Sequence, residues 1–237
     1  MINKKELAGI LSGIEGFLTL EEGKLLFDLA KNTKTDSIVE IGSWKGKSTV
    51  CLGLGSKEGS GIKIYAIDPH TGSLEHQNEF KGNVWTFDIF KENVRRSGIE
   101  DMIVPIVKPS GEAVKDFNQE VSLIFIDGAH EYDAVKKDFE DWISKIVDGG
   151  VVAFHDTIGW AGPRKVVEEY LYKSNNFINI GFVDSITYGT KVSNNNLLDR
   201  IKNRYILCLR DFSEYVRPLP IPKVIKKTGK KILNIFT

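Results

Sequence analysis

Residues 36–49, with the sequence DSIVEIGSWKGKST, constrain the fold of this chain more than any other stretch. Residues 37–41 form a short apolar run with one acid, which is typical of a strand buried on both faces of a parallel sheet. Gly42 and Gly46 then bracket a tight turn, and a helix is predicted to begin at Lys47. Glycines let a backbone approach a ligand, and the N–H groups of a helix start point at it. This corner can therefore bind a nucleotide, although similar turns also occur without a ligand.

Further apolar runs alternate with helical patterns along the chain. The predicted strands cover residues 63–67, 102–107, 121–126 and 151–154, and the predicted helices cover residues 47–54, 83–97, 132–147 and 163–173. Pro105 places its strand toward an edge of the sheet. Residues 177–183 and 186–192 predict a closing antiparallel hairpin that turns at Asp184 and Ser185. The pattern predicts an α/β fold: a doubly wound, Rossmann-like, seven-stranded sheet, mostly parallel with an antiparallel last strand, and helices on both faces.

Four regions are expected along the chain. Two helices form an N-terminal cover over residues 1–35, and Thr19 with Glu22 fits a capping box for the second of them. Residues 36–195 form the main domain, in which Gly149 and Gly150 close the helix before the fifth strand. Residues 196–222 are a C-terminal helix and a Pro-rich linker, and residues 223–237 are a basic amphipathic tail. Such a tail can lie on an anionic membrane, dock onto a partner or pack on its own domain.

Composition excludes little. Basic and acidic residues number 32 each, so net charge gives no reason to expect a nucleic-acid partner. Cys51 and Cys208 lie in apolar segments without metal spacing, and we expect both to be buried thiols in a reducing compartment. Apolar runs are too short to span a membrane, and the N-terminus lacks a signal-peptide core. We expect a cytoplasmic protein that is peripheral at a membrane surface if the tail binds lipid.

Polar residues follow several of the predicted strands. Asp68 ends the second strand, where an acid can accept both hydroxyls of a ribose or can cap the turn before Pro69. Ser110 is either a helix N-cap or a ligand contact. The carboxyl ends of parallel strands share one edge of a sheet, and ligands bind there. We therefore expect these residues to meet a further group that follows the fourth and fifth strands, namely Asp127, His130, His155 and Asp156.

Four blocks in this order and spacing, EIGSWKGKST, IYAIDPHTG, SLIFIDGAHEYDAVKKDFEDW and GGVVAFHDT, resemble class I S-adenosylmethionine-dependent methyltransferases. The nearest resemblance is to the branch of macrocin O-methyltransferase and the cephalosporin hydroxylase-like proteins. It covers residues 17–192, about three quarters of the chain. A dehydrogenase is disfavoured because residues 42–46 lack the G-x-G-x-x-G spacing.

The resemblance implies roles for residues around this edge. It places Glu40, Gly42 and Gly46 at the methionine part of S-adenosylmethionine, Asp68 at its ribose and Ser110 near its adenine. The full expected cofactor set adds Ser43, Trp44, Ser48 and Asp127. His130 would be the catalytic base with Asp127 beside it, and His155 with Trp160 would contact the substrate. The alternative for His130 is a plain helix N-cap.

A divalent metal, Mg or Mn, is implied at Asp127, His155 and Asp156. The related enzymes carry Glu-Asp where this chain has His155 and Asp156, and a histidine favours Mn²⁺ or Fe²⁺ over Mg²⁺. Plain hydrogen bonding within the loop is the alternative for this pair. The expected activity is O-methylation of a small hydroxylated molecule, with a sugar or a sugar-decorated metabolite as first guess. Trp160 and the loop at residues 70–87 would form a lid. A non-catalytic scaffold that binds a membrane or partner through its tail is the alternative, and the enzyme could form homo-oligomers.

Overall fold

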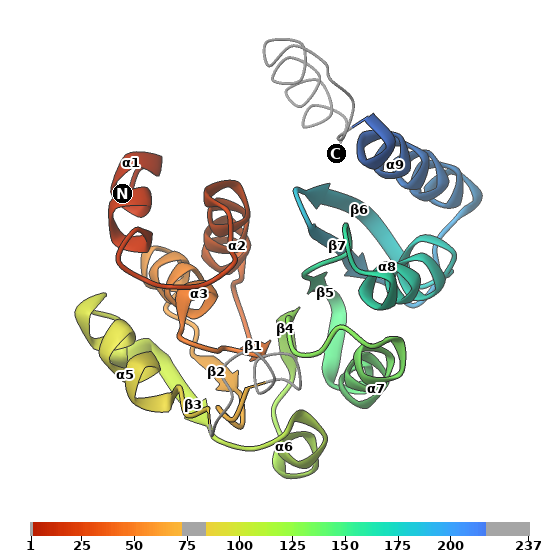
Figure 1. Ribbon diagram of the computed structural model, residues 1–237. Helices are drawn as coiled ribbons and strands as arrows, with labels where there is room; N and C mark the ends of the chain where they lie inside the picture. Colours follow the sequence, from red (N-terminus) through yellow and green to blue (C-terminus); the bar gives the residue numbers. More distant parts are fainter. Residues whose placement is uncertain (1, 73–83, 217–237) are drawn as a thin grey trace.

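The computed structural model describes residues 2–72 and 84–216 of the 237-residue chain. Its centre is a seven-stranded sheet with helices on both faces (Figure 1). The strands are β1 Ser37–Ile41, β2 Ile64–Ile67, β3 Ile103–Ile106, β4 Val121–Ile126, β5 Ile146–Phe154, β6 Phe177–Val183 and β7 Ile186–Lys191. The helices are α1 Lys4–Leu11, α2 Leu20–Asn32, α3 Lys47–Glu58, α5 Phe87–Arg96, α6 Ser110–Asp116, α7 Tyr132–Trp142, α8 Ala161–Val167 and α9 Leu197–Val216. Short 3₁₀ turns cover η1 Glu100–Met102 and η2 Ile143–Lys145, and a π turn covers η3 Glu168–Tyr172.

The strand order is β3-β2-β1-β4-β5-β7-β6. Strands β1 to β5 pair in parallel, whereas β7 is antiparallel to both of its neighbours. The Rossmann-like sheet with a reversed last strand is thus confirmed. Pro105 lies in β3, an edge strand, and its side chain is exposed. An edge position tolerates proline because the missing N–H is not needed by a further strand.

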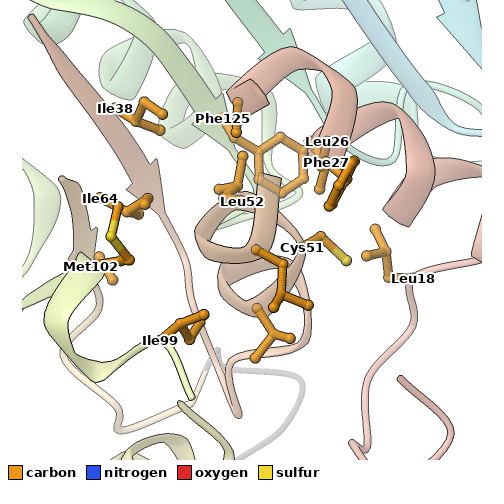
Figure 2. Packing of buried hydrophobic residues seen from close by; sticks show 14 of the residues in the cluster. Leu18, Leu26, Phe27, Ile38, Cys51, Leu52, Ile64, Ile99, Met102 and Phe125 are labelled. Atoms are coloured by element: carbon orange, nitrogen blue, oxygen red, sulfur yellow. The ribbon is translucent and has the colours of Figure 1, made fainter. Parts of the chain in front are cut away.

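One face of the sheet is covered by α1, α2, α3 and α5 (Figure 1). Figure 2 shows the buried side chains gathered around α3, with the ring of Phe125 of β4 beside Leu52 and beside Leu26 and Phe27 of α2. Helix α2 begins with the predicted capping box, in which the Thr19 hydroxyl accepts from the Glu22 amide and the Glu22 carboxylate accepts from the Thr19 amide. The N-terminal segment therefore packs on the sheet as a cover.

Helices α6, α7, α8 and α9 cover the other face, where Trp142 and Phe139 of α7 are buried against the sheet. Helix α9 is fastened by Arg210, a fully buried arginine that donates to Glu168 at 2.6 Å and lies over the ring of Tyr172. A buried guanidinium requires such partners, because an unpaired charge away from water is costly. Within the residues described, none of the helices combines the length and the apolar character needed to cross a membrane.

Two predicted helix ends are wrong, and both involve glycines. Helix α3 continues through Gly55 to Glu58, because a Cβ at Gly55 would lie 2.1 Å from the Phe27 carbonyl oxygen and the glycine serves close packing on α2. Helix α7 ends at Trp142, before Gly149 and Gly150. These two glycines lie inside β5, where the register with β4 shifts and Gly149 has φ of 88°. They form an irregularity in a strand, not a helix end.

Smaller differences concern the start of one helix and the exposure of one cysteine. Helix α5 begins at Phe87 rather than at residue 83, and Trp85 lies in the preceding loop. Cys51 is buried as expected, but Cys208 is exposed because it lies on the outward face of α9. The predicted Pro-rich linker beyond Val216 and the basic tail at residues 223–237 lie outside the described residues, as does the loop at residues 73–83.

Candidate active site

A cavity of about 620 Å³ lies at the carboxyl ends of β1, β2, β4 and β5. This is the position expected for a ligand in a doubly wound sheet, and the volume suits a cofactor-sized molecule. Most of the predicted site residues line it: Gly42, Ser43, Trp44, Ser48, Asp68, Ser110, Asp127, His130, His155, Asp156 and Trp160. Glu40 and Gly46 do not line it.

The two glycines of the β1–α3 turn are required by the backbone. Gly42 has φ of 85°, and a Cβ there would lie 2.1 Å from the Asp127 carbonyl oxygen. Gly46 has φ of 88° as the first residue before α3, and a Cβ there would lie 3.1 Å from the Phe90 ring. Both conformations favour glycine. The turn therefore brings the ends of β1 and β4 together and leaves the start of α3 facing the cavity.

Asp68 connects two loops at the cavity wall. Its Oδ2 accepts a hydrogen bond from the Trp44 amide at 2.7 Å, and its Oδ1 accepts from the His70 amide at 2.6 Å. Trp44 and His70 both have left-handed φ, 46° and 58°, which non-glycine residues adopt at a cost. An ionised carboxylate has about four acceptor positions, so each oxygen can accept one further donor. Asp68 can thus brace the turn and still bind a ligand.

Glu40 lies behind the turn with its carboxyl group fully buried. Burial raises its pKa to about 8, so the group is a neutral acid at neutral pH. Its Oε2 accepts from the Thr49 hydroxyl, whereas among the described residues its Oε1 has no hydrogen-bond partner. The buried hydroxyl of Ser43, which does line the cavity, also has no partner there. The Ser43 hydroxyl is therefore an atom that a polar ligand end in the cavity would complete, whereas Glu40 does not line the cavity.

The residues after β4 and β5 form one charged network. His155 Nδ1 lies 3.0 Å from Asp127 Oδ1 and 3.1 Å from Asp156 Oδ2. On its other side, His155 Nε2 lies 3.6 Å from Oε2 of Glu22, an ion-pair distance. Burial by itself would lower the pKa of His155, but the surrounding carboxylates, Asp127 foremost, raise it well above its ordinary value. His155 is therefore an imidazolium that holds three carboxylates together.

Glu22 is a site residue that the sequence pattern does not predict, because the pattern indicates only its part in the capping box of α2. Burial would raise the pKa of Glu22, but hydrogen bonds and charge from His155 and the Ser185 hydroxyl lower it to about 2. Its Oε1 accepts from the backbone N–H and the hydroxyl of Ser185, at 2.8 and 2.6 Å. A cap on α2 thus also joins the β6–β7 turn to the network. Sequence spacing carries no signal for this long-range contact.

His130 faces Asp156 rather than capping α7. Its Nε2 lies 3.1 Å from Asp156 Oδ2, and its ring stacks on Trp160 with centroids 4.1 Å apart. The residue that precedes α7 is Glu131, so the N-cap alternative is wrong. Burial would raise the pKa of Asp156, but hydrogen bonds from both histidines lower it. An ionised Asp156 only accepts, so Nε2 of His130 carries a proton and donates this hydrogen bond.

The opposite end of the cavity holds Ser110 and Asp138. Ser110 is not the N-cap of α6, since Pro109 precedes the helix, and its hydroxyl accepts from the indole N–H of Trp142 at 2.9 Å. Burial raises the pKa of Asp138 to about 6. Sequence analysis missed this acid. The available signal was its place on the apolar side of α7, between the buried Val135 and Phe139.

The α1–α2 loop forms the rim. Glu15, Gly16, Phe17 and Leu18 line the mouth of the cavity, and Phe17 is 84% exposed. Lys47 at the start of α3 donates to the Gly16 carbonyl at 2.9 Å, which ties the α1–α2 loop to the start of α3. Trp160, 41% exposed, lies across the mouth beside His130. Aromatic side chains thus border the cavity on both sides.

Two curated proteins are similar in sequence. Protein y4gI of Sinorhizobium fredii, described as uncharacterized, is 33% identical over 122 residues, which are 51% of this chain and 13% of that protein. Protein R132 of Acanthamoeba polyphaga mimivirus, also described as uncharacterized, is 30% identical over 140 residues, 56% of this chain and 57% of that protein. The chain thus spans little more than half of one relative and a small part of the other.

Solved structures share the fold. The S-adenosylhomocysteine-bound methyltransferase PaMTH1 of Podospora anserina matches with a TM-score of 0.60 and 14% identity, over 79% of this chain and 87% of that one. An O-methyltransferase of Bacillus cereus, in complex with S-adenosylhomocysteine, matches with a TM-score of 0.55 and 19% identity, over 79% and 90%. Residues 39–157 match the model of a family described as a methyltransferase domain. These residues are half of the chain and contain the turn, Asp68, and His155 with Asp127 and Asp156, so the protein belongs to the methyltransferase-domain family.

Proposed function

We propose that this protein transfers the methyl group of S-adenosylmethionine to a hydroxyl of a small neutral molecule, such as a sugar or a sugar-decorated metabolite. The observation that carries the proposal is the meeting, in one cavity, of the braced turn at Asp68 with the His130–Asp156 pair. The similar proteins from Podospora anserina and Bacillus cereus hold S-adenosylhomocysteine, the product of such a transfer, and the second is an O-methyltransferase.

In this proposal the cofactor lies along the cavity. The unused acceptor positions of Asp68 take the ribose hydroxyls, and the adenine lies toward Ser110 and Asp138. The methionine end lies at Ser43 and the start of α3, where the partnerless hydroxyl and the N–H groups of the helix start bind its carboxylate. Trp44, Ser48 and Asp127 complete the wall.

When bound, S-adenosylmethionine supplies an electrophilic methyl group on a sulfonium sulfur, so this chain must align an acceptor oxygen and remove its proton. His130 is the base: its imidazole takes the proton of the acceptor hydroxyl while Asp156 accepts from Nε2 and stabilises the imidazolium that forms. Asp156 itself stays in place through His155. A positioned base contributes about 10²–10⁴-fold, and alignment supplies much of the remainder.

The acceptor is neutral and hydroxylated in this proposal because the described lining is rich in acids. Glu15, Asp68, Asp127, Asp138 and Asp156 line the cavity, and Lys47 is the described lysine there, already bonded to a carbonyl. A phosphorylated or carboxylated acceptor would meet repulsion. The flat rings of Phe17 and Trp160 at the mouth suit the apolar face of a sugar or an aromatic ring.

A divalent ion remains part of the proposal at Asp127, His155 and Asp156. One ligand atom from each lies within 4.8 Å of the others, a spacing that fits a single ion. Such an ion, when bound, would lower the pKa of the acceptor hydroxyl. Because Nδ1 of His155 already faces both carboxylates, the histidine must lose its proton to become a ligand. A mixed imidazole and carboxylate set suits Mn²⁺ or Fe²⁺ more than Mg²⁺.

Calorimetric titration with S-adenosylmethionine and S-adenosylhomocysteine tests the cofactor. Asp68→Asn should weaken both by about 10–100-fold, since a hydrogen bond to a charged group contributes about 1.5–3 kcal/mol. Asp116→Asn, the same change on the exposed face of α6, is the control and should bind like the wild type. Absence of heat with the wild-type protein would refute the proposal and leave a non-catalytic scaffold.

Transfer of a labelled methyl group to a panel of polyols, sugars and catechols, with and without EDTA, tests the rest. Methylated product establishes the class of acceptor. Full activity in EDTA would remove the metal from the proposal and leave the methyl transfer intact. Loss of activity that Mn²⁺ restores better than Mg²⁺ would support the mixed donor set.

A further inference from the structure

Helix α9 carries a row of exposed apolar side chains that no described part of the chain covers. The row contains Leu198, Ile201, Tyr205, Cys208, Phe212 and Tyr215. Five of these are 49–76% exposed, and Cys208 is also exposed. The opposite side of α9, with Asn203, Ile206 and Arg210, is buried against β6 and η3. Figure 1 shows α9 at the periphery of the molecule, beyond β6 and α8.

The spacing of this row is 3, 4, 3, 4 and 3 residues, an unbroken a/d heptad pattern over the 20 residues of α9. A helix that packs only on its own domain needs one apolar face, and α9 already has that face buried. A second face with heptad spacing is the seam of a helix pair. We infer that α9 pairs with α9 of a second copy of this chain, antiparallel, across this seam.

Antiparallel pairing about a two-fold axis fits every member of the row. With the axis between Tyr205 and Cys208, each a position faces a d position of the second copy. Leu198 then faces Tyr215, Ile201 faces Phe212, and Tyr205 faces Cys208. A two-fold axis makes each of these contacts occur twice, as an isologous interface requires. Small Cys208 opposite large Tyr205 at the centre lets the helices approach closely.

The charged residues that flank the row also favour antiparallel pairing. Arg204 lies at a g position of the seam, exposed, and makes no ion pair with the described residues. The antiparallel register places it against the g position of the second copy, which is Asp211. This carboxylate pairs with Arg164 and Arg210 of its own chain and, at 43% exposed, can still accept from Arg204. Parallel pairing would instead bring Arg204 beside the e position, which is the partly buried Leu209, and leave the charges unmatched. The basic half of one α9 therefore meets the acidic half of the other.

The area is sufficient for a reversible dimer. Six side chains that lose on the order of 100 Å² each bury roughly 600 Å² per copy and roughly 1,200 Å² in all, the lower end of specific interfaces. An occupant from the same chain fits less well, because residues 223–237 contain five lysines and no acid and would meet the basic half formed by Arg200, Lys202 and Arg204. A second copy supplies both halves.

Sedimentation velocity of the full chain over a micromolar concentration series measures the association. The wild type should show a monomer–dimer equilibrium. Ile201→Glu should abolish it, and Ile89→Glu, the same change at a 47% exposed position of α5, should leave it unchanged. Arg204→Glu should weaken the dimer at least tenfold, whereas Lys202→Glu, at the position that faces Leu209, should change it much less.

Disulfide trapping tests the direction. Under mild oxidation Tyr205→Cys should form covalent dimers with Cys208 of the second copy, while the wild type and Ile201→Cys should not. Covalent dimers of all three would show parallel pairing and overturn the inference. A chain that stays monomeric overturns the inference as well. In that case, rapid labelling of the Cys208 thiol would show that this face of α9 is open to solvent. Slow labelling at every protein concentration would show that the chain's own C-terminal residues cover it. Cys51 is buried and serves as the unreactive internal reference.

Discussion

Replacing Glu22 by Gln removes one charge from the centre of the molecule and keeps the shape of the side chain. The Glu22 side chain is 2% exposed, faces His155 at 3.6 Å and accepts from Ser185 and Thr19. Glutamine has nearly the same shape, but its NH₂ group is a donor that must face either Ser185 or Thr19, so the hydrogen bonds to that side are lost. The change therefore removes both the interaction of the carboxylate with the His155 imidazolium and part of its hydrogen bonding.

The magnitude follows from the pKa of Glu22. A pKa lowered from 4.5 to about 2 corresponds to about 3 kcal/mol of stabilisation of the folded state. The group needs no large discount for solvent screening, because it is buried. Since the folded-state pKa is the lower one, this stabilisation is fully present above pH 4.5 and disappears as the pH falls through about 2.

Urea unfolding followed by circular dichroism, at neutral pH and at several acidic values, measures the difference between wild type and Glu22→Gln. We expect about 3 kcal/mol at neutral pH, shrinking steadily below pH 4.5. Glu21→Gln is the control, because Glu21 pairs with Lys4 at the exposed surface and should cost under about 1 kcal/mol. Equal stabilities of wild type and Glu22→Gln at neutral pH, or a difference that does not depend on pH, would refute the charged network around His155.

Three further changes probe the site. Gly42→Ala should destabilise the fold by about 3 kcal/mol in urea unfolding, because the new Cβ meets the Asp127 carbonyl. Gly61→Ala is the control: Gly61 has φ of 70° with open space around it, so the change should cost about 1–2 kcal/mol. Equal costs of the two changes would contradict the close approach at Gly42. His130→Ala should lower turnover at least about tenfold with little change in cofactor affinity, and unchanged turnover would exclude it as the base. Asp138 has a raised pKa, so it adds to wild-type stability as the pH falls through about 6. Asp138→Asn should therefore gain less stability than the wild type in unfolding measured from pH 8 to pH 4, and the rise that it keeps comes from Glu40, whose pKa is raised to about 8.

The sheet and the edge that carries the site could be predicted because both depend on local patterns. Short apolar runs ending in Asp68, Asp127 and His155 identify parallel strands and place their following residues together. Pro105 marked an edge strand for the same kind of local reason: a missing N–H is a property of the residue itself.

The errors have a common cause, which is long-range packing. Gly55 and Gly150 both have the sequence pattern of a helix end, but each is a glycine because other atoms lie close to it. At Gly55 these are the atoms of the Phe27 carbonyl. At Gly150 they are the Ile146 side chain and the carbonyl oxygens of Val147 and Val121. The sequence around Glu22 indicates only a helix cap, because nothing near it in the chain shows that His155 lies beside it. Cys208 was expected to be buried because its helix is apolar on two sides and a sequence does not say which side the domain covers.

The contact between Glu22 and His155 also determines where this protein can be shortened. A fragment that starts at Asp36 would retain all seven strands and every residue of the methyltransferase-family match. It would nevertheless lose Glu22 of α2, which pairs with His155 and accepts hydrogen bonds from Ser185. The first 35 residues are thus an integral part of the working unit, and fusion partners or truncations intended to preserve it belong before Asn3.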